Sequence, residues 1–497
     1  MIFNSVQFLV FFPIVTAVYF ILPKKIRYIW LLIASYYFYM CWNAKYAILL
    51  FLSTFVTYVC GLLIEKVKSK EWEEPKKKCY KKIYMISGIS INLIILFVFK
   101  YYNFAIINLT RVLGFLQLDV ELPEFSLILP VGISFYTFQA LGYMIDVYRD
   151  EIYAEKNLLR YALFVSFFPQ LVAGPIERSK NLLVQLQKEQ KLTWDNFKEG
   201  ILLILYGLFL KIVIADRVAV FVNHVYENPE GYQGIFILVA TVFFAFQIYC
   251  DFYGYSTIAR GTALILGIHL MDNFKAPYFS RSIKEFWQRW HISLSSWFRD
   301  YLYIPLGGNR KGEIRKEVNL LVVFGVSGLW HGASISYIVW GLLNGIYQVI
   351  GDFRKKSLNK YSWLKSSGKN NFSSKMLSQF VTFILVCFAW IFFRAESFSD
   401  AVVIIKNMLC FNWHILFDGS LYGLGIAKET FGIILGFIAI LLYVDYKKYK
   451  GLDVAKSCLK QEWWFQCLIY VGLFWCIVLF GCYGVEYEAS QFIYFQF

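Results

Sequence analysis

The sequence predicts an all-α integral membrane protein, with roughly eleven to thirteen transmembrane or re-entrant helices forming one domain over residues 1–497. Hydrophobic residues make up 58% of the chain and charged residues 17%, whereas soluble globular chains are about half apolar and about a quarter charged. The mean hydropathy is +0.52. Aromatic residues make up 20% of the chain, which excludes an intrinsically disordered protein.

Apolar runs recur along the whole chain, and a spanning helix needs about 20 mostly apolar residues. Several runs are short or contain proline, glycine or charged residues, namely Pro169, Gly174, Lys211 and Asp216. Such helices are tolerated where protein or a cavity surrounds them, so broken or re-entrant helices are expected. The runs are Ser5–Leu22, Tyr28–Trp42, Tyr46–Ile64, Ile83–Phe99, Leu127–Tyr148, Leu158–Ile176, Gly200–Val222, Gly234–Tyr253, Val318–Trp330, Ile335–Ile350, Leu377–Phe393, Phe431–Tyr446 and Trp464–Cys482.

Basic residues set the predicted orientation. Lys and Arg total 49 against 34 Asp and Glu, and the excess of +15 gathers between the apolar runs. Cytoplasmic loops carry such an excess, so this charge is a topology signal in a protein surrounded by membrane lipid, and no nucleic-acid partner is expected. Both termini, including the tail 485–497, are then extracytoplasmic, and the first run is a retained span. The groups are Lys24–Arg27, Lys66–Lys82, Arg354–Lys375 and Lys447–Lys460.

His331 is the strongest candidate for chemistry. It directly follows the apolar run Val318–Trp330, and an ionisable side chain at membrane depth is a functional candidate because its burial is costly. Small residues nearby allow close approach of another helix. The alternative is a buried histidine satisfied by a backbone carbonyl. The small residues are Gly325, Ser327, Gly328 and Gly332.

The segment around His291 predicts one amphipathic helix, too charged to span lipid and half-buried near the cytoplasmic side. The alternative is a peripheral helix with a solvated histidine. His224, His269 and His414 are predicted to be structural, and the ten cysteines show no spacing typical of a metal site or a disulfide framework. The two faces recur at helical spacing: Phe286, Trp290, Leu294, Trp297 and Tyr301 on one, Lys284, Gln288, His291, Ser295 and Arg299 on the other.

The chain ends in the aromatic segment Gln491–Phe497. Free termini are normally polar and mobile, so this tail is predicted to bind in a cleft, or alternatively to be an interfacial anchor. A phenol has a pKa of about 10, so an ester on Tyr494 would be comparatively reactive.

Several motifs resemble the membrane-bound O-acyltransferase family, and within it the alginate O-acetylation protein I-like subgroup, related to the teichoic acid D-alanyl transfer proteins. The resemblance spans nearly the whole chain, and its extent to Phe497 favours the alginate-type branch. The motifs are Asp251-Phe-Tyr-Gly-Tyr-Ser256, Arg289-Trp-His-Ile-Ser-Leu-Ser295, Phe298-Arg-Asp-Tyr-Leu-Tyr-Ile-Pro-Leu-Gly-Gly-Asn-Arg310, Leu329-Trp-His-Gly-Ala333, Asn4-Ser-Val-Gln-Phe8 and Phe168-Pro-Gln-Leu-Val-Ala-Gly-Pro-Ile176.

This resemblance implies an acyltransferase of the bacterial inner membrane, with helices around a membrane-crossing tunnel. The signature histidines of the family map onto His291 and His331, the second usually held to be catalytic. The donor would be a cytoplasmic acyl thioester, acetyl-CoA or an acyl carrier protein, with no permanently bound cofactor and no metal. An SGNH-hydrolase-like extracytoplasmic partner would place the acyl group, expected to be acetyl, on a surface polysaccharide. Phe492, Tyr494 and Phe497 match a Phe-x-Tyr-x-x-Phe motif that accepts the acyl group in related systems.

In the predicted mechanism His331 is the general base for the Tyr494 hydroxyl, which attacks the thioester carbonyl. His291 positions the donor or polarises its carbonyl. Neighbouring tryptophans wall the tunnel and exclude water, or simply pack. These are Trp287, Trp290 and Trp330.

Three other functions remain open. A transporter or flippase would show paired intramembrane charges and repeat symmetry, neither of which the sequence predicts. A non-catalytic subunit of a polysaccharide export complex would tolerate loss of both histidines. A lipid or protein acyltransferase of the same family would take its acceptor from within the bilayer. The polymer, the acyl group and the choice of donor are also open.

Overall fold

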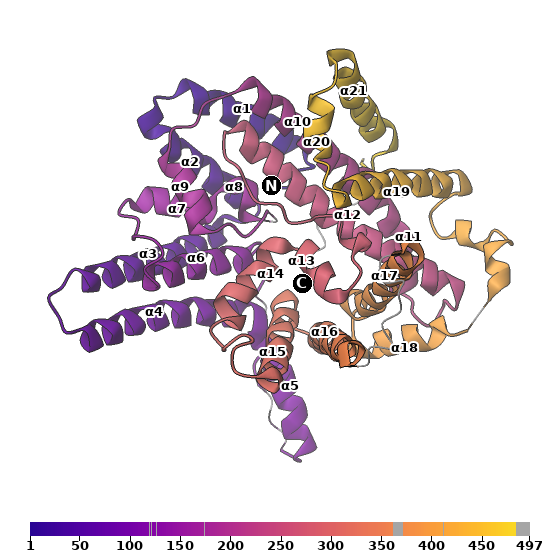
Figure 1. Cartoon of the computed structure of the whole chain (residues 1–497), viewed down its shortest axis with the longest axis horizontal. Coiled ribbons are helices and arrows are strands. Elements are labelled where there is room, and N and C mark those ends of the chain that lie inside the picture. Colours follow the sequence, from indigo (N-terminus) through magenta and orange to yellow (C-terminus); the bar gives the residue numbers. More distant parts are fainter. Residues whose placement is uncertain are drawn as a thin grey trace. The chain divides into compact units, whose positions relative to one another are not determined.

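The structure is a computed structural model that describes residues 1–118, 120, 122–125, 127–172, 174–360, 371–410 and 412–483, except for the side chains of 358–360. The described residues form helices and connecting segments, with no strand among them (Figure 1). The all-α prediction is therefore confirmed.

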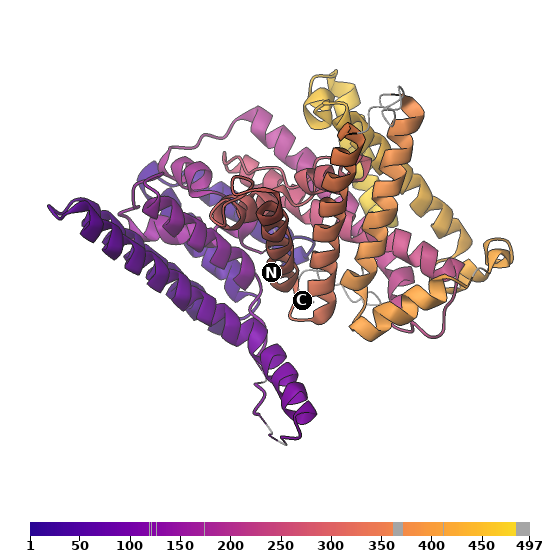
Figure 2. The ribbon, with the colours of Figure 1, turned by 60° about the horizontal axis from the view of Figure 1, so that its bottom comes forward.

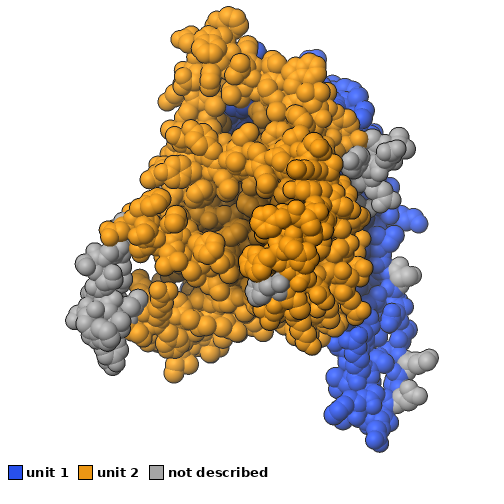
Figure 3. Space-filling view, turned by 90° about the vertical axis from the view of Figure 1, so that its right-hand side faces the viewer, with its two compact units in different colours: residues 1–204, 258–271 blue, residues 205–257, 272–497 orange. Residues whose placement is uncertain are grey.

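The chain forms two compact units, shown in different colours in Figure 3. Unit 1 comprises Met1–Ile204 and Ile258–Met271, and unit 2 comprises Leu205–Thr257 and Asp272–Phe497. The single domain over residues 1–497 stays a prediction, because compactness does not say whether either unit folds by itself.

Unit 1 is built from the N-terminal helices. Within it α3, α4 and α6 pack against one another, and α2 packs on α7 (Figure 1). α4 continues through the π-helical turn Phe97–Tyr101 into α5 (Figure 2). The helices are α1 (Val6–Ile21), α2 (Arg27–Met40), α3 (Ala47–Lys68), α4 (Glu74–Leu96), α5 (Tyr102–Phe115), α6 (Ile133–Tyr148), α7 (Leu158–Ser166), α8 (Phe168–Leu171), α9 (Ser179–Gln187), most of α10 (Trp194–Leu208) and the end of α12 (Ile235–Ile265).

Unit 2 contains both candidate histidines. Its most closely packed pair of helices is α15 and α16, and α17 packs on α16. The elements are the π-helical segment Phe209–Ala215, α11 (Asp216–Tyr226), most of α12, α13 (Ile283–Arg289), α14 (Ile292–Phe298), α15 (Glu313–His331), α16 (Ile335–Lys360), α17 (Phe372–Arg394), α18 (Phe398–Met408), α19 (Lys428–Tyr449), α20 (Val454–Leu459) and α21 (Trp463–Phe480).

Six helical stretches in the described chain are long and apolar enough to cross a bilayer. Each of the thirteen apolar runs overlaps a helix, but several of these helices are shorter than the six or are interrupted, and the run 127–148 becomes helical only at Ile133. The structure therefore confirms a polytopic membrane protein. The six stretches are Ala44–Lys68, Glu74–Phe115, Ile235–Ile265, Phe372–Arg394, Lys428–Tyr449 and Trp463–Phe480.

Two of the expected interruptions have clear local causes. The run 158–176 breaks at Phe167, whose backbone is not helical, and Pro169 is the second residue of the next helix, α8. Proline suits a first helical turn because its missing N–H has no helical acceptor there. The Ser35 hydroxyl accepts the freed N–H of Phe168 at 3.1 Å. In the run 200–222, the helix widens into the π-helical segment that carries Lys211.

Candidate acyltransferase site

Burial separates the two candidate histidines from the other three. His291 exposes 0% and His331 4% of its surface, whereas His224, His269 and His414 are exposed. A buried imidazole needs partners for its polar atoms, and both rings make interactions within the protein. The expectation that His224, His269 and His414 are structural stays a prediction.

His331 is the last residue of α15, directly before the turn into α16. The helix begins at Glu313, five residues before the predicted run, so it is about 28 Å long at 1.5 Å per residue. Its imidazole lies edge-to-face against Trp340, at 4.9 Å between ring centroids, and against Phe393, at 5.4 Å. The histidine is therefore held in an aromatic environment built by α15, α16 and α17.

Glycines bring α15 and α16 into close contact behind His331. A Cβ at Gly328 would lie 2.2 Å from the Tyr337 carbonyl oxygen, and one at Gly341 would lie 2.3 Å from the Phe324 carbonyl oxygen. The predicted role of small residues is thus confirmed at Gly328. It is not confirmed at Gly325, where a Cβ would make an ordinary 3.4 Å contact with Leu342.

The prediction of one continuous amphipathic helix around His291 is wrong. The chain breaks between α13 and α14, with Trp290 extended and His291 left-handed at φ 44° and ψ 55°. This conformation costs an L-residue about 1–2 kcal/mol, although histidine tolerates it better than most residues. The break turns the imidazole into the protein, so His291 is buried and neither half-exposed nor solvated.

Asn273 holds the start of α14 in place. The first N–H groups of a helix lack partners within it, and His291 provides no side-chain cap. Instead the Asn273 carbonyl accepts the N–H of Ile292 at 3.0 Å, and its side-chain oxygen accepts the N–H of Ser293 at 3.2 Å. Asn273, at 1% exposed, thus caps the helix from a distant part of the chain. Local sequence patterns do not indicate this role.

One indole connects the two histidines. Trp330 lies 6.2 Å from the His291 ring and 4.8 Å from the His331 ring, centroid to centroid. Further tryptophans join the surrounding helices: Trp290 contacts Trp390 at 5.2 Å, and Trp287 contacts Trp340 at 5.7 Å. All three predicted wall tryptophans are therefore in this cluster, which also contains Trp340, Trp390 and Phe393.

The motif Asp251–Ser256 on α12 supports the same site. Phe252 packs edge-to-face on His291 at 4.6 Å. Gly254 allows the end of α10 and the π-helical segment to approach, since a Cβ there would lie 2.7 Å from the Gly207 carbonyl oxygen and 3.1 Å from the Lys211 backbone nitrogen. Asp251 pairs with Lys211 of that segment at 2.6 Å.

Lys211 also pairs with Asp216 at 2.8 Å, and all three of these charged side chains are buried. This corrects the expectation that the chain lacks paired charges of the kind found in transporters. A buried ammonium is tolerated here because two carboxylates compensate it.

Tyr494, with Phe492 and Phe497, lies outside the described residues, so its predicted role stays a prediction, as do the catalytic roles of His291 and His331. Within the described parts of the chain, no group of three or more His, Cys, Asp or Glu side chains is placed to hold a metal ion. The expectations of no metal and no permanently bound cofactor likewise stay predictions.

The model of the membrane-bound O-acyltransferase family matches residues 149–394, which include both histidines. The chain is 37% identical over 436 residues to a probable alginate O-acetylase of Pseudomonas putida, covering 86% of this chain and 84% of the relative. It is 33% identical to a peptidoglycan O-acetyltransferase of Helicobacter pylori (83% and 80% covered) and 30% identical to a teichoic acid D-alanyltransferase of Bacillus subtilis (56% and 71% covered). The chain belongs to the membrane-bound O-acyltransferase family and is an acyltransferase.

Proposed function

We propose that this enzyme moves an acyl group, expected to be acetyl, from a cytoplasmic thioester across the bacterial inner membrane for O-acylation of a cell-surface polysaccharide. The observation that carries the proposal is the packing of His291 and His331, from two separate motifs, against the single indole of Trp330. The relatives named above, whose names refer to alginate, peptidoglycan and teichoic acid, support a surface polymer as the final acceptor.

The proposed chemistry is an ester exchange on the C-terminal tail. The Tyr494 oxygen attacks the thioester carbonyl, a C–O bond forms and the C–S bond breaks. His331 takes the phenol proton and passes it to the departing thiolate, leaving a free thiol and an aryl ester. His291 positions the donor or polarises its carbonyl. The SGNH-hydrolase-like partner then transfers the acyl group from the aryl ester to a polysaccharide hydroxyl.

Burial of both imidazoles sets a requirement on this proposal. Because neither ring is at the surface, donor and acceptor must reach them through the protein interior, as the predicted tunnel would allow. The aromatic surroundings would exclude water and so protect the thioester from hydrolysis. We also propose that the four basic groups lie in the cytoplasm and that both termini lie outside it.

Labelled acyl transfer tests the function. Membranes containing the full-length protein are incubated with acetyl-labelled coenzyme A or with an acetylated acyl carrier protein, and label on the protein and on surface glycan is measured. We expect His331→Ala to lower both by about a hundredfold or more, the usual range for a general base, while the protein stays in the membrane. His224→Ala, which changes an exposed histidine of the same unit, is the control. Undiminished acylation by His331→Ala would remove this residue from the mechanism.

Tyr494→Phe tests the tail separately. If Tyr494 carries the acyl group, this variant loses protein-bound label and glycan acylation together. If the variant retains glycan acylation, the tail is an anchor and transfer runs directly to the partner.

The buried cluster of Lys211, Asp216 and Asp251 is the observation that favours a transporter as the second candidate. A transporter would carry its substrate unchanged and form no acylated protein. A labelled ester on the wild-type protein would therefore exclude a transporter that carries its substrate unchanged.

A further inference from the structure

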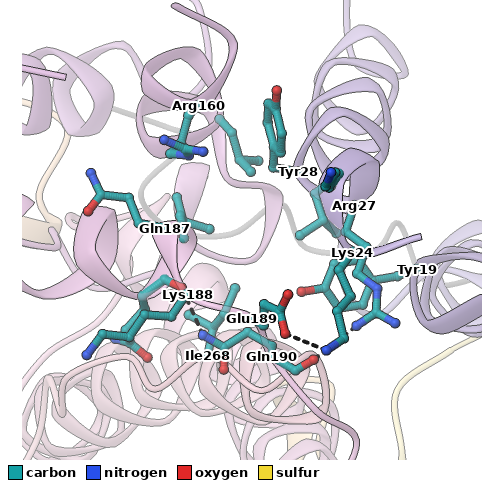
Figure 4. A pocket seen from close by; sticks show the side chains of 15 residues that line it. Tyr19, Lys24, Arg27, Tyr28, Arg160, Gln187, Lys188, Glu189, Gln190 and Ile268 are labelled. Atoms are coloured by element: carbon teal, nitrogen blue, oxygen red, sulfur yellow. Dashed lines mark hydrogen bonds and ion pairs between the residues drawn. The ribbon is translucent and has the colours of Figure 1, made fainter. Parts of the chain in front are cut away.

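Unit 1 contains a pocket whose walls are rich in cations. Its volume is about 190 Å³, and five of its lining side chains are basic whereas one, Glu189, is acidic. Pockets for whole drug-sized ligands are larger, about 300–1,000 Å³, so this space suits a small charged group. Figure 4 shows Arg160, Lys24 and Lys188 on different sides of the space. The basic residues are Lys24, Lys25, Arg27, Arg160 and Lys188.

These cations converge from three separate parts of unit 1. Lys24, Lys25 and Arg27 lie at the turn between α1 and α2, Arg160 is on α7, and Lys188 follows α9. A topology signal requires only that basic residues lie on one side of the membrane. It does not require residues so distant in sequence to line a common cavity.

Part of the positive charge has local compensation. Lys24 forms an ion pair with Glu189, and this hydrogen bond lowers the pKa of the Glu189 carboxyl. The Arg160 Nη1 atom forms an ion pair with the Glu155 Oε1 atom at 3.4 Å. Arg27 donates only to neutral carbonyl oxygens, those of Phe20, Leu22 and Gln190, at 3.0 Å each. Its charge is therefore not neutralised by these bonds.

The remaining cations have capacity for a ligand. Lys25 and Lys188 are exposed, and neither has an ion pair with another residue that the structure describes. The Arg160 Nε is buried and makes no hydrogen bond to the described parts of the chain. A group with several acceptor oxygens and negative charge would pair with both lysines, and a phosphate has these properties.

We propose that this pocket binds a phosphate group, carried either by the headgroup of an anionic phospholipid or by a soluble phosphorylated donor such as coenzyme A. The predicted topology places the pocket at the cytoplasmic side, where both sources occur. Basic pockets between helices on this side are known to hold anionic headgroups.

Binding to the purified full-length protein tests the proposal in two arms. One compares dioctanoyl phosphatidylglycerol with the net-neutral dioctanoyl phosphatidylcholine, and the other compares coenzyme A with pantetheine, which lacks phosphate. We expect the anionic probe of at least one arm to bind more tightly than its partner. A preference in the first arm alone identifies a lipid, and a preference in the second alone identifies the donor.

The double variant Lys25→Ala/Lys188→Ala should weaken that binding about thirtyfold, since each lysine near a phosphate contributes about fivefold. The matched control is Lys66→Ala/Lys78→Ala, which removes two exposed lysines of the same unit. These lysines are also predicted to lie on the cytoplasmic side of the membrane. All variants are checked for unchanged elution on size exclusion.

Equal binding of the partners in both arms, or unchanged binding by the Lys25/Lys188 variant, would overturn the proposal. His331→Ala should bind as the wild type does. Failure of the acyl-transfer proposal and failure of this one are thus distinguishable.

Discussion

The two histidines of the site are presented by very different backbone. His331 ends a regular helix, and its position depends on how closely α15 and α16 pack through Gly328 and Gly341. His291 lies at a left-handed break between two short helices, and its position depends on capping by Asn273. One ring is thus placed by helix packing and the other by a local backbone conformation with a distant hydrogen-bond partner.

This difference has a consequence for mutation. Changes that separate two helices should displace His331, whereas changes at a single hydrogen bond or dihedral angle should displace His291. Under the proposed mechanism both kinds of change should slow acyl transfer, since both imidazoles act in it. Stability and activity, measured together, separate the two effects.

The largest effect is expected for Gly328→Ala. Its new Cβ would lie 2.2 Å from the Tyr337 carbonyl oxygen, a backbone atom that cannot move alone, so α15 and α16 must separate. Overpacking of this kind costs about 1–3 kcal/mol, and a displacement of about 1 Å in a catalytic group can cost about a hundredfold in rate. We expect such a loss in labelled acyl transfer per folded protein. Gly325→Ala, with an ordinary 3.4 Å contact, should keep wild-type activity, and equal effects of the two would show that helix separation does not position His331.

Periodic sequence patterns predicted the regular region well. Each apolar run in the sequence marks a place where the structure has a helix. The small residues before His331 predicted close helix packing, and the structure shows it at Gly328. These signals work because a helix repeats its environment every few residues, so several residues report the same face.

The region around His291 shows where such signals fail. Helical spacing from Lys284 to Tyr301 predicted one helix, but a single left-handed residue divides it. Histidine is compatible with both conformations, so its identity did not reveal the break. The capping residue, Asn273, lies 18 positions earlier, beyond the reach of any local pattern. The family resemblance identified His291 as a candidate, whereas its burial and its contact with Trp330 required the structure.

An intermediate effect is expected for Asn273→Ala. The substitution leaves the buried N–H of Ser293 without its acceptor, which costs about 1–3 kcal/mol, and it loosens the turn that carries His291. We expect a lower midpoint of thermal unfolding in detergent and a slower acyl transfer per folded protein. Asn319→Ala is the control, since this buried side chain donates to the carbonyls of Leu306 and Gly308 at the base of α15, far along the helix from His331. If Asn319→Ala loses as much activity as Asn273→Ala for the same loss of stability, Asn273 has no particular role in positioning His291.

The smallest effect concerns the backbone at His291 itself, and it appears as a difference between two pairs of variants. At φ 44° asparagine is tolerated whereas valine is strained, so His291→Val should be less stable than His291→Asn by about 1–2 kcal/mol. His331 is helical, and valine and asparagine have similar intrinsic helix propensities. The backbone conformation should therefore cause a much smaller difference in stability between His331→Val and His331→Asn. All four variants lack an imidazole and should be inactive, so thermal unfolding in detergent is the measurement. A valine penalty at position 331 as large as at 291 would mean that side-chain burial, rather than left-handed backbone, distinguishes the two positions.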